Sequence, residues 1–332
     1  MFERNIYEHY QLYCNEKMTI GAFDAFEANG QLFIAVPADY ETAQELQQCQ
    51  AMGDFLRSYG EEGVASIVKT VKGEDTALVD GQSIFLFHCP LAQYTSARTM
   101  NPGEKLALFH QKGLYYPQQQ SSPYFGQWKY FWEKRLDQLE NWYQYILQQP
   151  YKTPIDEEFL LTFPYYMGLT ENAIQYVVDT QFDAPEWARP TICHRRFTNK
   201  AWPQLFNRHH EPLDIKLPTE WIIDHPVRDV AEWMREQCFI EGGEGEIEKF
   251  VRAYESVMPI SKQAWRLLYA RLLFPLHYFE AMEGYYQKRF DDRYIIQVLN
   301  NEARNQQFLY RLFEKFPLAY DETLFPMVDW LR

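Results

Sequence analysis

The side chains that could do chemistry gather in one stretch of the chain, residues 191 to 235. A cationic island lies near its start and consists of Arg195, Arg196, Lys200 and Arg208. Guanidinium and ammonium groups either pair with carboxylates of their own chain or hold an external anion, because both partners present anionic oxygens. We favour ion pairing, with Glu211 and Asp214 as nearby carboxylates, since surface arginines usually find partners within the chain.

Histidines and a cysteine in the same stretch suggest two further kinds of site. His209 and His210, together with Asp214, have the residue types of a metal site, but adjacent histidines lack the i, i+4 spacing of a helical ligand pair. Cys193 beside His194 has the types of a thiol nucleophile with its base, yet sequence neighbours rarely face each other as such a pair must. We therefore expect neither a metal site nor a thiol nucleophile here.

The order of elements in this stretch resembles aminoglycoside, choline and fructosamine phosphotransferases, which have a kinase-like fold. In those families a strand precedes the motif H-G-D-x-x-x-x-N, a β-hairpin carries a metal-binding Asp, and a later helix opens with D-L-A. Here His194 stands at the motif histidine, and Asp229 in PVRDVAEW matches the Asp that opens the helix. The resemblance implies a bracing role for Asp229 and not a catalytic one.

The positions that carry the chemistry in this resemblance hold other residues. Arg196 stands where the catalytic Asp belongs, and Ala201 falls at the Mg²⁺-binding Asn. Pro37, in FIAVPAD, falls where a lysine would pair with the phosphates, and proline has neither the charge nor the reach. Asp214 remains as a candidate metal carboxylate, although it lies fifteen residues before Asp229 instead of roughly a dozen.

Longer phrases resemble the endospore coat-associated family of the YutH type, a branch of the spore-coat kinase-like family found in endospore-forming Bacilli. They are LALFHQKGLYYP, FPYYMGLTENAIQYVVDT, LPTEWIIDHPVRDVAEWMRE and WRLLYARLLFPLHYFEAMEGYY. The broader coat family keeps His-Gln-Asp before its aromatic residue, whereas this chain has Arg195 and Arg196 before Phe197. The resemblance implies synthesis in the mother-cell cytoplasm, deposition in the spore coat, and other spore-coat proteins as partners.

The composition excludes several classes of protein. With 46% hydrophobic and 23% charged residues in 332, the chain resembles an ordinary globular protein and not a disordered one. Its formal charge of -14 repels phosphate backbones, so we expect no nucleic-acid partner. No apolar run reaches the roughly 18 residues that a membrane span requires. Five scattered cysteines without a C-x-x-C pair indicate free thiols and not a zinc site or a disulfide framework.

The elements that must position the candidate residues change in kind near residue 90. Between residues 22 and 90, short β-prone runs alternate with turns at Asn29-Gly30 and Asp80-Gly81. These dipeptides tolerate positive φ, so each predicts a two-residue hairpin. One helical stretch, residues 40 to 59, interrupts the runs, and the whole predicts a small antiparallel sheet that carries one helix.

Beyond residue 90, apolar and aromatic side chains recur at the three- and four-residue spacing of amphipathic helices. The predicted helices run from Trp128 to near residue 149, from a cap at Thr170, from a cap at Ser261 to Pro275, and across residues 295 to 312. The expected fold class is therefore α+β, as a two-lobed protein-kinase-like fold. We expect the N-lobe at 1–90, and a mostly helical C-lobe at 91–332 with a degenerate catalytic loop at 191–201.

These expectations combine into a catalytically inactive kinase-fold protein, a pseudokinase, that acts through protein docking in coat assembly and uses no cofactor. Two alternatives stay open. One is a small-molecule phosphotransferase that uses ATP and Mg²⁺ through Asp214, because phosphoryl transfer depends mostly on positioning and charge stabilisation. The other is a module that binds a nucleotide without turning it over.

Overall fold

The computed structural model describes residues 1–38, 43–90, 100–117, 124, 126–183, 189–206, 212–238, 240 and 242–315. Their packing forms two compact units. One combines Met1–Gln119 with Thr191–Ile222, and the other combines Gln120–Pro190 with Ile223–Arg332. The first unit holds an antiparallel sheet and the second is helical, so the α+β class is confirmed. The lobe boundary expected between 1–90 and 91–332 stays a prediction.

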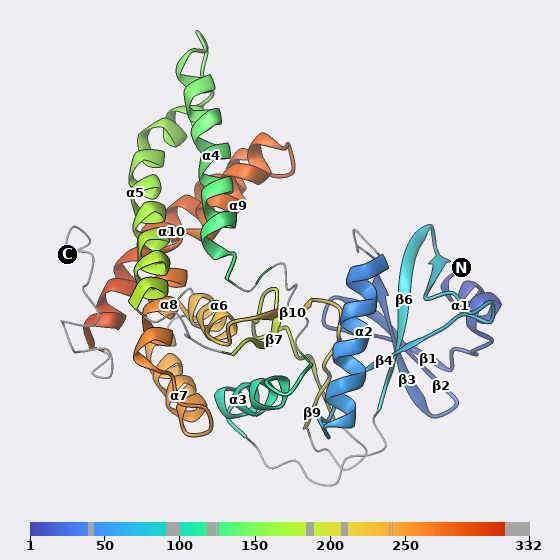
Figure 1. Ribbon diagram of the computed structural model, residues 1–332. Helices are drawn as coiled ribbons and strands as arrows, with labels where there is room; N and C mark the ends of the chain where they lie inside the picture. Colours follow the sequence, from blue (N-terminus) through green and yellow to red (C-terminus); the bar gives the residue numbers. More distant parts are fainter. Residues whose placement is uncertain are drawn as a thin grey trace. The chain divides into compact units, whose positions relative to one another are not determined.

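A six-stranded antiparallel sheet forms the centre of the first unit (Figure 1). Its strands are β1 (Glu16–Ile20), β2 (Phe23–Ala28), β3 (Gln31–Pro37), β4 (Ser66–Val68), β5 (Thr76–Val79) and β6 (Gln82–Cys89). They are ordered β1-β2-β3-β6-β4, and β5 also pairs with β6. The predicted antiparallel sheet is therefore confirmed.

Two tight turns set the register of this sheet. Asn29 and Gly30 join β2 to β3 with φ of 54° and 71°, and Asp80 and Gly81 join β5 to β6 with φ of 48° and 84°. Positive φ at both central positions matches the right-handed twist of the flanking strands. Both predicted hairpins are thus confirmed.

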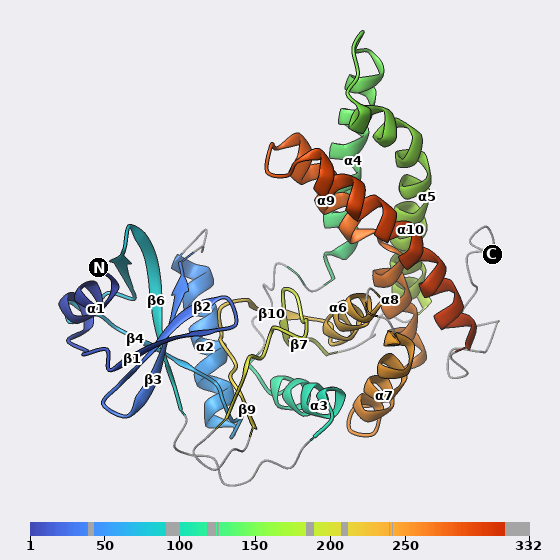
Figure 2. The ribbon, with the colours of Figure 1, turned by 180° about the vertical axis from the view of Figure 1, so that it is seen from behind.

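Each face of the sheet is covered by a helix, as Figures 1 and 2 show. Helix α1 (Phe2–Tyr10) packs on the face that includes Phe33 of β3, while α2 (Ala43–Ser58) packs on the face that includes Ile34 and Val36. Successive strand residues point to opposite faces, so β3 is buried on both sides. Helix α2 corresponds to the helix predicted over residues 40 to 59.

The remaining elements of the first unit hold the loop that follows β7 (Thr191–His194). Helix α3 (Pro102–Gly113) packs against β7. Later in the chain come β8 (Gln204–Phe206), β9 (Pro212–Asp214) and β10 (Trp221–Asp224), and the last two residues of β10 belong to the second unit. Strand β7 pairs with β10, and β8 pairs with β9. Thr191 Oγ1 donates to the carbonyl oxygen of His110 at 2.6 Å, which joins β7 to α3.

The second unit is a set of helices with an aromatic interior. They are α4 (Trp128–Leu147), α5 (Pro154–Asp183), α6 (Val227–Gln237), α7 (Gly243–Glu255), α8 (Lys262–Leu273), α9 (Leu276–Tyr286) and α10 (Asp292–Lys315). Helix α5 packs on α4 and α8, and α6 packs on α7 and α8. Buried rings stack between helices, with centroids 3.8 Å apart for Tyr166 and Tyr278. None of the described helices is long and apolar enough to cross a bilayer.

Two of the predicted helix starts had different outcomes. Ser261 caps α8, because its side chain accepts the N–H of Ala264 at 3.1 Å, and this prediction is confirmed. The predicted start at Thr170 is wrong, since Thr170 lies inside α5 and donates its hydroxyl to the Tyr166 carbonyl at 2.8 Å. A threonine inside a helix can donate its hydroxyl to the carbonyl four residues earlier, so a threonine does not have to mark the start of a helix.

Candidate functional site

A pocket of about 350 Å³ lies in the first unit, beside the loop that follows β7. Its apolar wall comes from Phe23 at the start of β2, Val36 in β3 and Leu217 between β9 and β10. The loop after β7 supplies the cationic and polar wall. The other lining residues are Pro37, Glu45, His194, Arg195, Arg196, Thr198, Lys200, Ala201, Pro203, Thr219, Glu220 and Trp221.

The structure brings together the positions that the motif comparison singled out. Pro37 is the last residue of β3 and lies opposite Ile84 of β6, more than 150 residues before Arg196 and Ala201 in the chain. All three line the same pocket. Pro37 and Ala201 offer no side-chain donor, acceptor or charge there, and the guanidinium of Arg196 cannot accept a proton.

Leu217 is a further lining residue of the pocket, and the sequence analysis did not name it. It lies twelve residues before Asp229, close to the spacing of roughly a dozen that the metal carboxylate of the related enzymes has. The position that faces the pocket therefore holds an apolar side chain. Asp214 as the metal-position carboxylate stays a prediction.

Asp214 is engaged in other contacts and is not among the lining residues of the pocket. Its Oδ2 accepts from Lys105 Nζ of α3 at 2.5 Å, and its Oδ1 accepts from Gln204 Nε2 of β8 at 3.2 Å. The side chain is 14% exposed, so this ion pair is screened less than a pair on the open surface. Asp214 therefore joins α3 to the β8–β9 hairpin.

The cationic island does form an ion pair, but with a partner that the sequence did not indicate. Arg195 Nη2 lies 2.8 Å from Glu45 Oε1, at the start of α2. Asp214, one of the two expected partners, pairs with Lys105 instead, and Glu211 lies outside the described residues, as do Arg208, His209 and His210. Glu45 precedes Arg195 by 150 residues, so only folding brings them together.

His194, at the motif histidine, is held in an aromatic cage. It is 3% exposed, and Trp202 Nε1 donates to its Nε2 at 3.1 Å. The rings of Phe109 and Phe197 lie 5.2 and 5.0 Å from the imidazole, centroid to centroid. His194 thus orders the loop.

The segment that carries Leu217 is fixed by a buried ion pair. Lys216 Nζ lies 2.6 Å from Glu61 Oε1, and Lys112 Nζ lies 2.7 Å from Glu61 Oε2. Burial raises the pKa of Glu61, but the two ammonium groups outweigh it and lower that pKa below its usual value. The ammonium of Lys216 also lies 4.8 Å from the centre of the Trp202 ring. Leu217 is thereby held at the pocket wall.

Sequence comparison supplies the family. A family model described as "Spore coat putative kinase YutH" matches residues 3 to 312. The chain belongs to this family. The "Endospore coat-associated protein YutH" of Bacillus subtilis (strain 168) is 35% identical over 343 residues, which cover 100% of this chain and 98% of the relative.

Solved structures show which fold this YutH-family chain has. An aminoglycoside phosphotransferase from Alicyclobacillus acidocaldarius matches with a TM-score of 0.64 at 15% identity, over 95% of this chain and 96% of that one. A microcompartment-associated aminopropanol kinase matches with a TM-score of 0.62 at 12% identity, over 93% and 96%. At these identities the likeness concerns the fold alone, and it confirms the predicted kinase-like phosphotransferase fold.

The described lining of the pocket does not fit a phosphate chain held through Mg²⁺. Magnesium sites in such enzymes use one or two protein carboxylates together with the phosphates. The lining carboxylates here are Glu45, which is bonded to Arg195, and Glu220. Arg196 and Lys200 add positive charge, which disfavours a second cation nearby. We derive no Mg²⁺-dependent step from this arrangement in the YutH-family chain.

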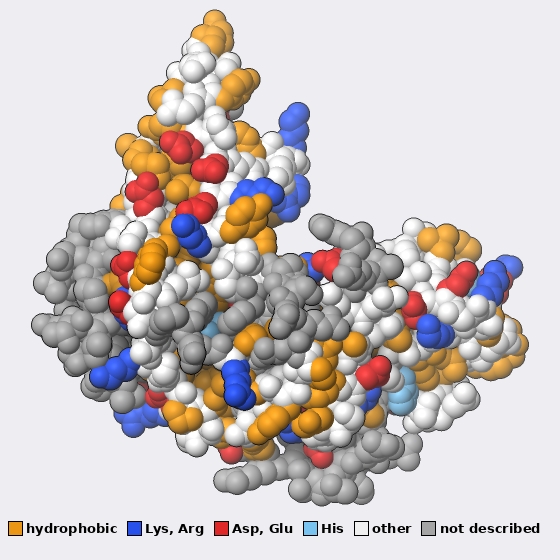
Figure 3. All heavy atoms as spheres, in the orientation of Figure 1, with side chains coloured by type: hydrophobic (Ala, Val, Ile, Leu, Met, Phe, Trp, Pro, Cys, Tyr) orange, Lys and Arg blue, Asp and Glu red, His pale blue; other side chains and the backbone are white. Residues whose placement is uncertain are grey.

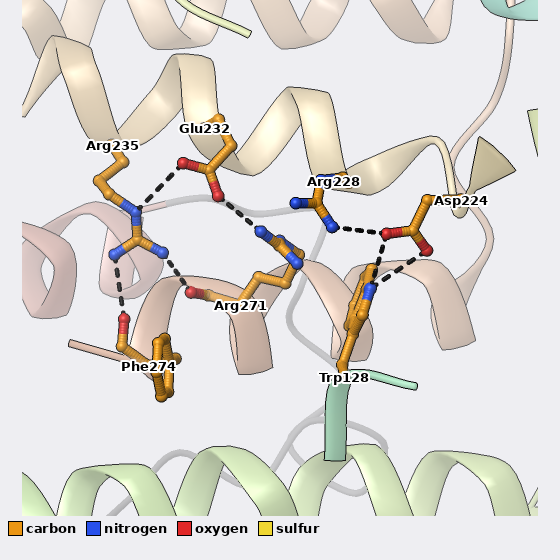
Figure 4. Close-up of polar contacts among 7 residues, drawn as sticks. All are labelled: Trp128, Asp224, Arg228, Glu232, Arg235, Arg271 and Phe274. Carbon is orange, nitrogen blue, oxygen red and sulfur yellow. Dashed lines mark hydrogen bonds and ion pairs between the residues drawn. The ribbon is translucent and has the colours of Figure 1, made fainter. Parts of the chain in front are cut away.

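The other two conspicuous carboxylates of the YutH-family chain belong to the second unit, and Figure 4 shows one of them. Asp224, at the end of β10, accepts from Trp128 Nε1 at 2.8 and 3.1 Å and from Arg228 Nη1 at 2.7 Å. It also accepts the N–H of His225 at 2.7 Å, so it shapes the turn into α6. Asp229 lies fully buried in the first turn of α6.

A buried ladder of charges continues along α6 and α8 (Figure 4). Glu232 Oε1 accepts from Arg271 Nη2 at 2.6 Å, and Arg235 Nη1 donates to the Phe274 carbonyl at 3.1 Å. Burial raises the pKa of Glu232, but the charges of Arg271 and its neighbours outweigh it and lower that pKa to about 2. Burial and the nearby Arg228 lower the pKa of Arg271 to about 10. These buried contacts join α6 to α8 and to the residue that follows α8.

Proposed function

We propose that this member of the YutH family is a catalytically inactive kinase-fold protein that works by docking to other spore-coat proteins. The observation that carries the proposal is the lining of the pocket. Pro37, Arg196 and Ala201 meet there. The sequence resemblance places a lysine, an aspartate and an asparagine at these three positions in the related enzymes. Phosphoryl transfer relies on those groups for positioning and charge stabilisation.

Loss of one such group alone would be compatible with catalysis, but loss of the lysine, the aspartate and the asparagine together removes the functions that the pocket would have to supply. A proton acceptor, a metal ligand set and a phosphate-pairing lysine are each replaced by a residue of different chemistry. The phosphotransferase alternative depended on Asp214, which is bonded to Lys105 and lies outside the pocket lining. Inactivity is therefore the function class that the geometry supports best.

Exposed aromatic residues support the docking part of the proposal. Many of the aromatic side chains are buried in the core, but some lie at the end of the α4–α5 pair where the two helices are joined. There the side chains of Tyr145, Leu147 and Tyr151 are 63%, 47% and 91% exposed. Figure 3 shows hydrophobic side chains at this end. Tyrosines supply large contact areas at protein interfaces, with a hydroxyl for hydrogen bonds. The coat association in the relative's name gives the context for such partners.

The first test concerns catalysis. We expect the purified chain to hydrolyse no ATP above the buffer blank and to phosphorylate no added aminoglycoside or amino alcohol. We also expect ATP to give the same thermal shift with Mg²⁺ as with EDTA, because metal-linked binding to the folded state would raise the melting temperature. Turnover that disappears in an Asp214→Asn variant would establish the phosphotransferase alternative and overturn this proposal.

The second test concerns the coat. We propose that the chain is made in the mother-cell cytoplasm and then deposited in the spore coat. A fluorescent fusion, expressed during sporulation of Bacillus subtilis that lacks its own YutH, should gather around the forespore. An Arg196→Gln fusion should do the same, since docking does not require the pocket, whereas a Tyr145→Ser/Tyr151→Ser fusion should gather less. Fluorescence that stays diffuse in the mother cell would contradict coat docking.

A further inference from the structure

We propose that copies of this chain associate head to tail through the second unit. In this arrangement the turn between α9 and α10 of one copy binds the outer face of the α4–α5 pair of the next copy. The inference concerns contacts between copies of one chain, so it depends neither on the loss of catalysis nor on docking to other coat proteins. It rests on the charges, the rigidity and the placement of the two surfaces.

The first surface is a basic turn that consists of Lys288, Arg289 and Arg293, at the end of α9 and the start of α10. All three residues are exposed, and none forms an ion pair with a described carboxylate. Asp291 and Asp292 lie in the same segment, so three cations and two carboxylates leave one positive charge. The whole chain has a formal charge of -14, so this turn attracts acidic surfaces as few other places on the chain do.

The backbone holds the basic turn in one conformation. Lys288 has a φ of 60°, and the N–H of Arg289 donates to the carbonyl oxygen of Gly284 at 2.7 Å, which is the bond pattern that closes a helix C-terminus. A Cβ at Gly284 would collide with the ring of Phe290, so this ring packs directly over the glycine. Tyr294 packs on Phe290 with ring centroids 4.4 Å apart. A turn fixed in this way loses little conformational freedom when it binds.

The second surface is an acidic face of the α4–α5 pair, and it consists of Asp137, Glu140, Glu157 and Glu171. All four residues are exposed, and none forms an ion pair with a lysine or arginine among the described residues. Glu157 and Glu171 are fourteen residues apart, which is nearly four helical turns, so they share one side of α5. Figure 3 shows acidic side chains gathered over these two helices.

The acidic face lies on the side of α4 that is turned away from α9. Arg135 Nε donates to Glu283 Oε1 of α9 at 2.7 Å, and the ring of Trp142 packs on a ring of α9 with centroids 5.1 Å apart. Asp137 and Glu140 are each two residues from one of these positions, which is about 200° around the helix axis. One copy therefore cannot join its own two surfaces, and contacts between unlike surfaces continue from copy to copy.

Apolar side chains accompany the charges on both surfaces. Tyr294 and Ile296 beside the basic turn are 45% and 51% exposed, and Leu161 and Tyr165 of α5 are 76% and 41% exposed. Burial of such side chains supplies affinity, while opposite charges select the partner and its orientation. At physiological ionic strength, charges more than about 8 Å apart are largely screened. The repulsion between two acidic chains is thus weakened, whereas opposite charges in contact still attract.

Sedimentation velocity of the purified chain tests the association. At about 0.15 M salt, we expect species larger than a dimer to form as the concentration rises towards about 100 μM. Salt at about 1 M should weaken the association about tenfold, because the screening length falls from about 8 Å to about 3 Å. A chain that stays monomeric, or that stops at a dimer, would overturn the inference.

Two variants assign the contact to these surfaces. Arg289→Gln/Arg293→Gln removes charge from the basic turn, and Asp137→Asn/Glu140→Gln removes charge from the acidic face. Each variant alone should associate about tenfold more weakly than the parent chain. An equimolar mixture should form dimers and nothing larger, because each variant keeps one charged surface. A mixture that stays monomeric, or that grows beyond dimers, would overturn the inference.

A matched control removes two cations from another part of the second unit. Lys249 and Arg252 of α7 have side chains that are 67% and 69% exposed. Lys249→Gln/Arg252→Gln changes the net charge as much as the basic-turn variant does and should associate like the parent chain. Melting curves show whether each variant is folded. Equal weakening in the control would show that net charge, and not the basic turn, governs the association.

Discussion

Under the proposed function, Arg196 carries a fixed positive charge at the position where the resemblance expects a proton acceptor. A guanidinium stays protonated throughout the pH range in which proteins are folded, so no change of pH turns it into a base. Its neighbours in the pocket lining, Pro37, Ala201 and Leu217, lack the other functional groups as well. The proposed loss of catalysis therefore rests on several residues of one pocket and not on Arg196 alone.

Restoring one of these residues should not restore catalysis. We expect Arg196→Asp to show no ATP turnover, because Pro37 still leaves the phosphates without their lysine and Ala201 still leaves the metal without its asparagine. A phosphate-release assay with Mg²⁺ and a panel of hydroxyl substrates checks this. Measurable turnover in the single variant, absent from the parent chain, would contradict the assignment of these positions.

Glu232 should be among the carboxylates on which stability depends most. Its side chain is 3% exposed and lies between Arg271 and Arg235. Replacing it with glutamine leaves buried guanidinium groups without their counter-charge, which costs about 3–5 kcal/mol of unfolding free energy. Urea denaturation measures the loss. Glu246→Gln is the matched control, since Glu246 is 57% exposed, and it should change little.

The same carboxylate predicts a pH dependence. The pKa of Glu232 is about 2 in the folded state and about 4.5 without the fold, so its contribution to stability is complete above about 4.5. That contribution is lost as the pH falls from 4.5 towards 2, because the unfolded chain takes up the proton first. Denaturation curves over this window should fall more steeply for the parent chain than for Glu232→Gln. Parallel curves would contradict the buried ion pair.

Strand β7 packs very close to the C-terminal end of α3. A Cβ at Gly113 would lie 2.8 Å from the backbone nitrogen of Ile192 and also meet Thr191 Oγ1. Backbone atoms at this distance cannot move aside as a flexible side chain can. A glycine at this position lets the strand that leads into the loop of Arg196 pack directly on α3.

A pair of glycine substitutions tests this packing. Gly113→Ala should lower the unfolding free energy by about 1–3 kcal/mol, because β7 must shift away from α3. Gly245→Ala in α7 meets no atom within 4 Å and should raise stability by about 0.5–1 kcal/mol, since alanine favours the helix. Thermal and urea denaturation of both variants measure the difference. A neutral Gly113→Ala would show that the strand has room.

The five cysteines of the chain differ in how deeply their side chains are buried. All are free thiols, with Cys49, Cys89 and Cys193 buried and Cys14 and Cys238 partly exposed. Burial raises the pKa of Cys89 to about 12, which removes the reactive thiolate near neutral pH.

Thiol titration should therefore separate two classes. An aromatic disulfide reagent at mildly alkaline pH should react with the two partly exposed thiols in the native chain and with all five after denaturation. Non-reducing and reducing conditions should give the same melting temperature. A native chain that reacts rapidly at a third site would contradict the described packing around Cys49, Cys89 or Cys193.

Local chemistry was enough to predict many elements of this chain. Asn29-Gly30 and Asp80-Gly81 specify their hairpins because positive φ is a property of the turn residues themselves. Ser261 likewise caps α8 through an N–H only three residues away. The replaced positions Pro37 and Arg196 were also visible as residue types at motif spacings.

Contacts between distant segments required the folded chain. Glu45 became the partner of Arg195 because α2 packs beside the loop after β7, at a separation of 150 residues. Leu217 lines the pocket whereas Asp214 does not, and the neighbouring Lys216 is tied to Glu61, 155 residues earlier in the chain. Ion pairs and pocket walls depend on which segments pack together. The residue types along the chain are compatible with several such packings, so only the folded chain selects one of them.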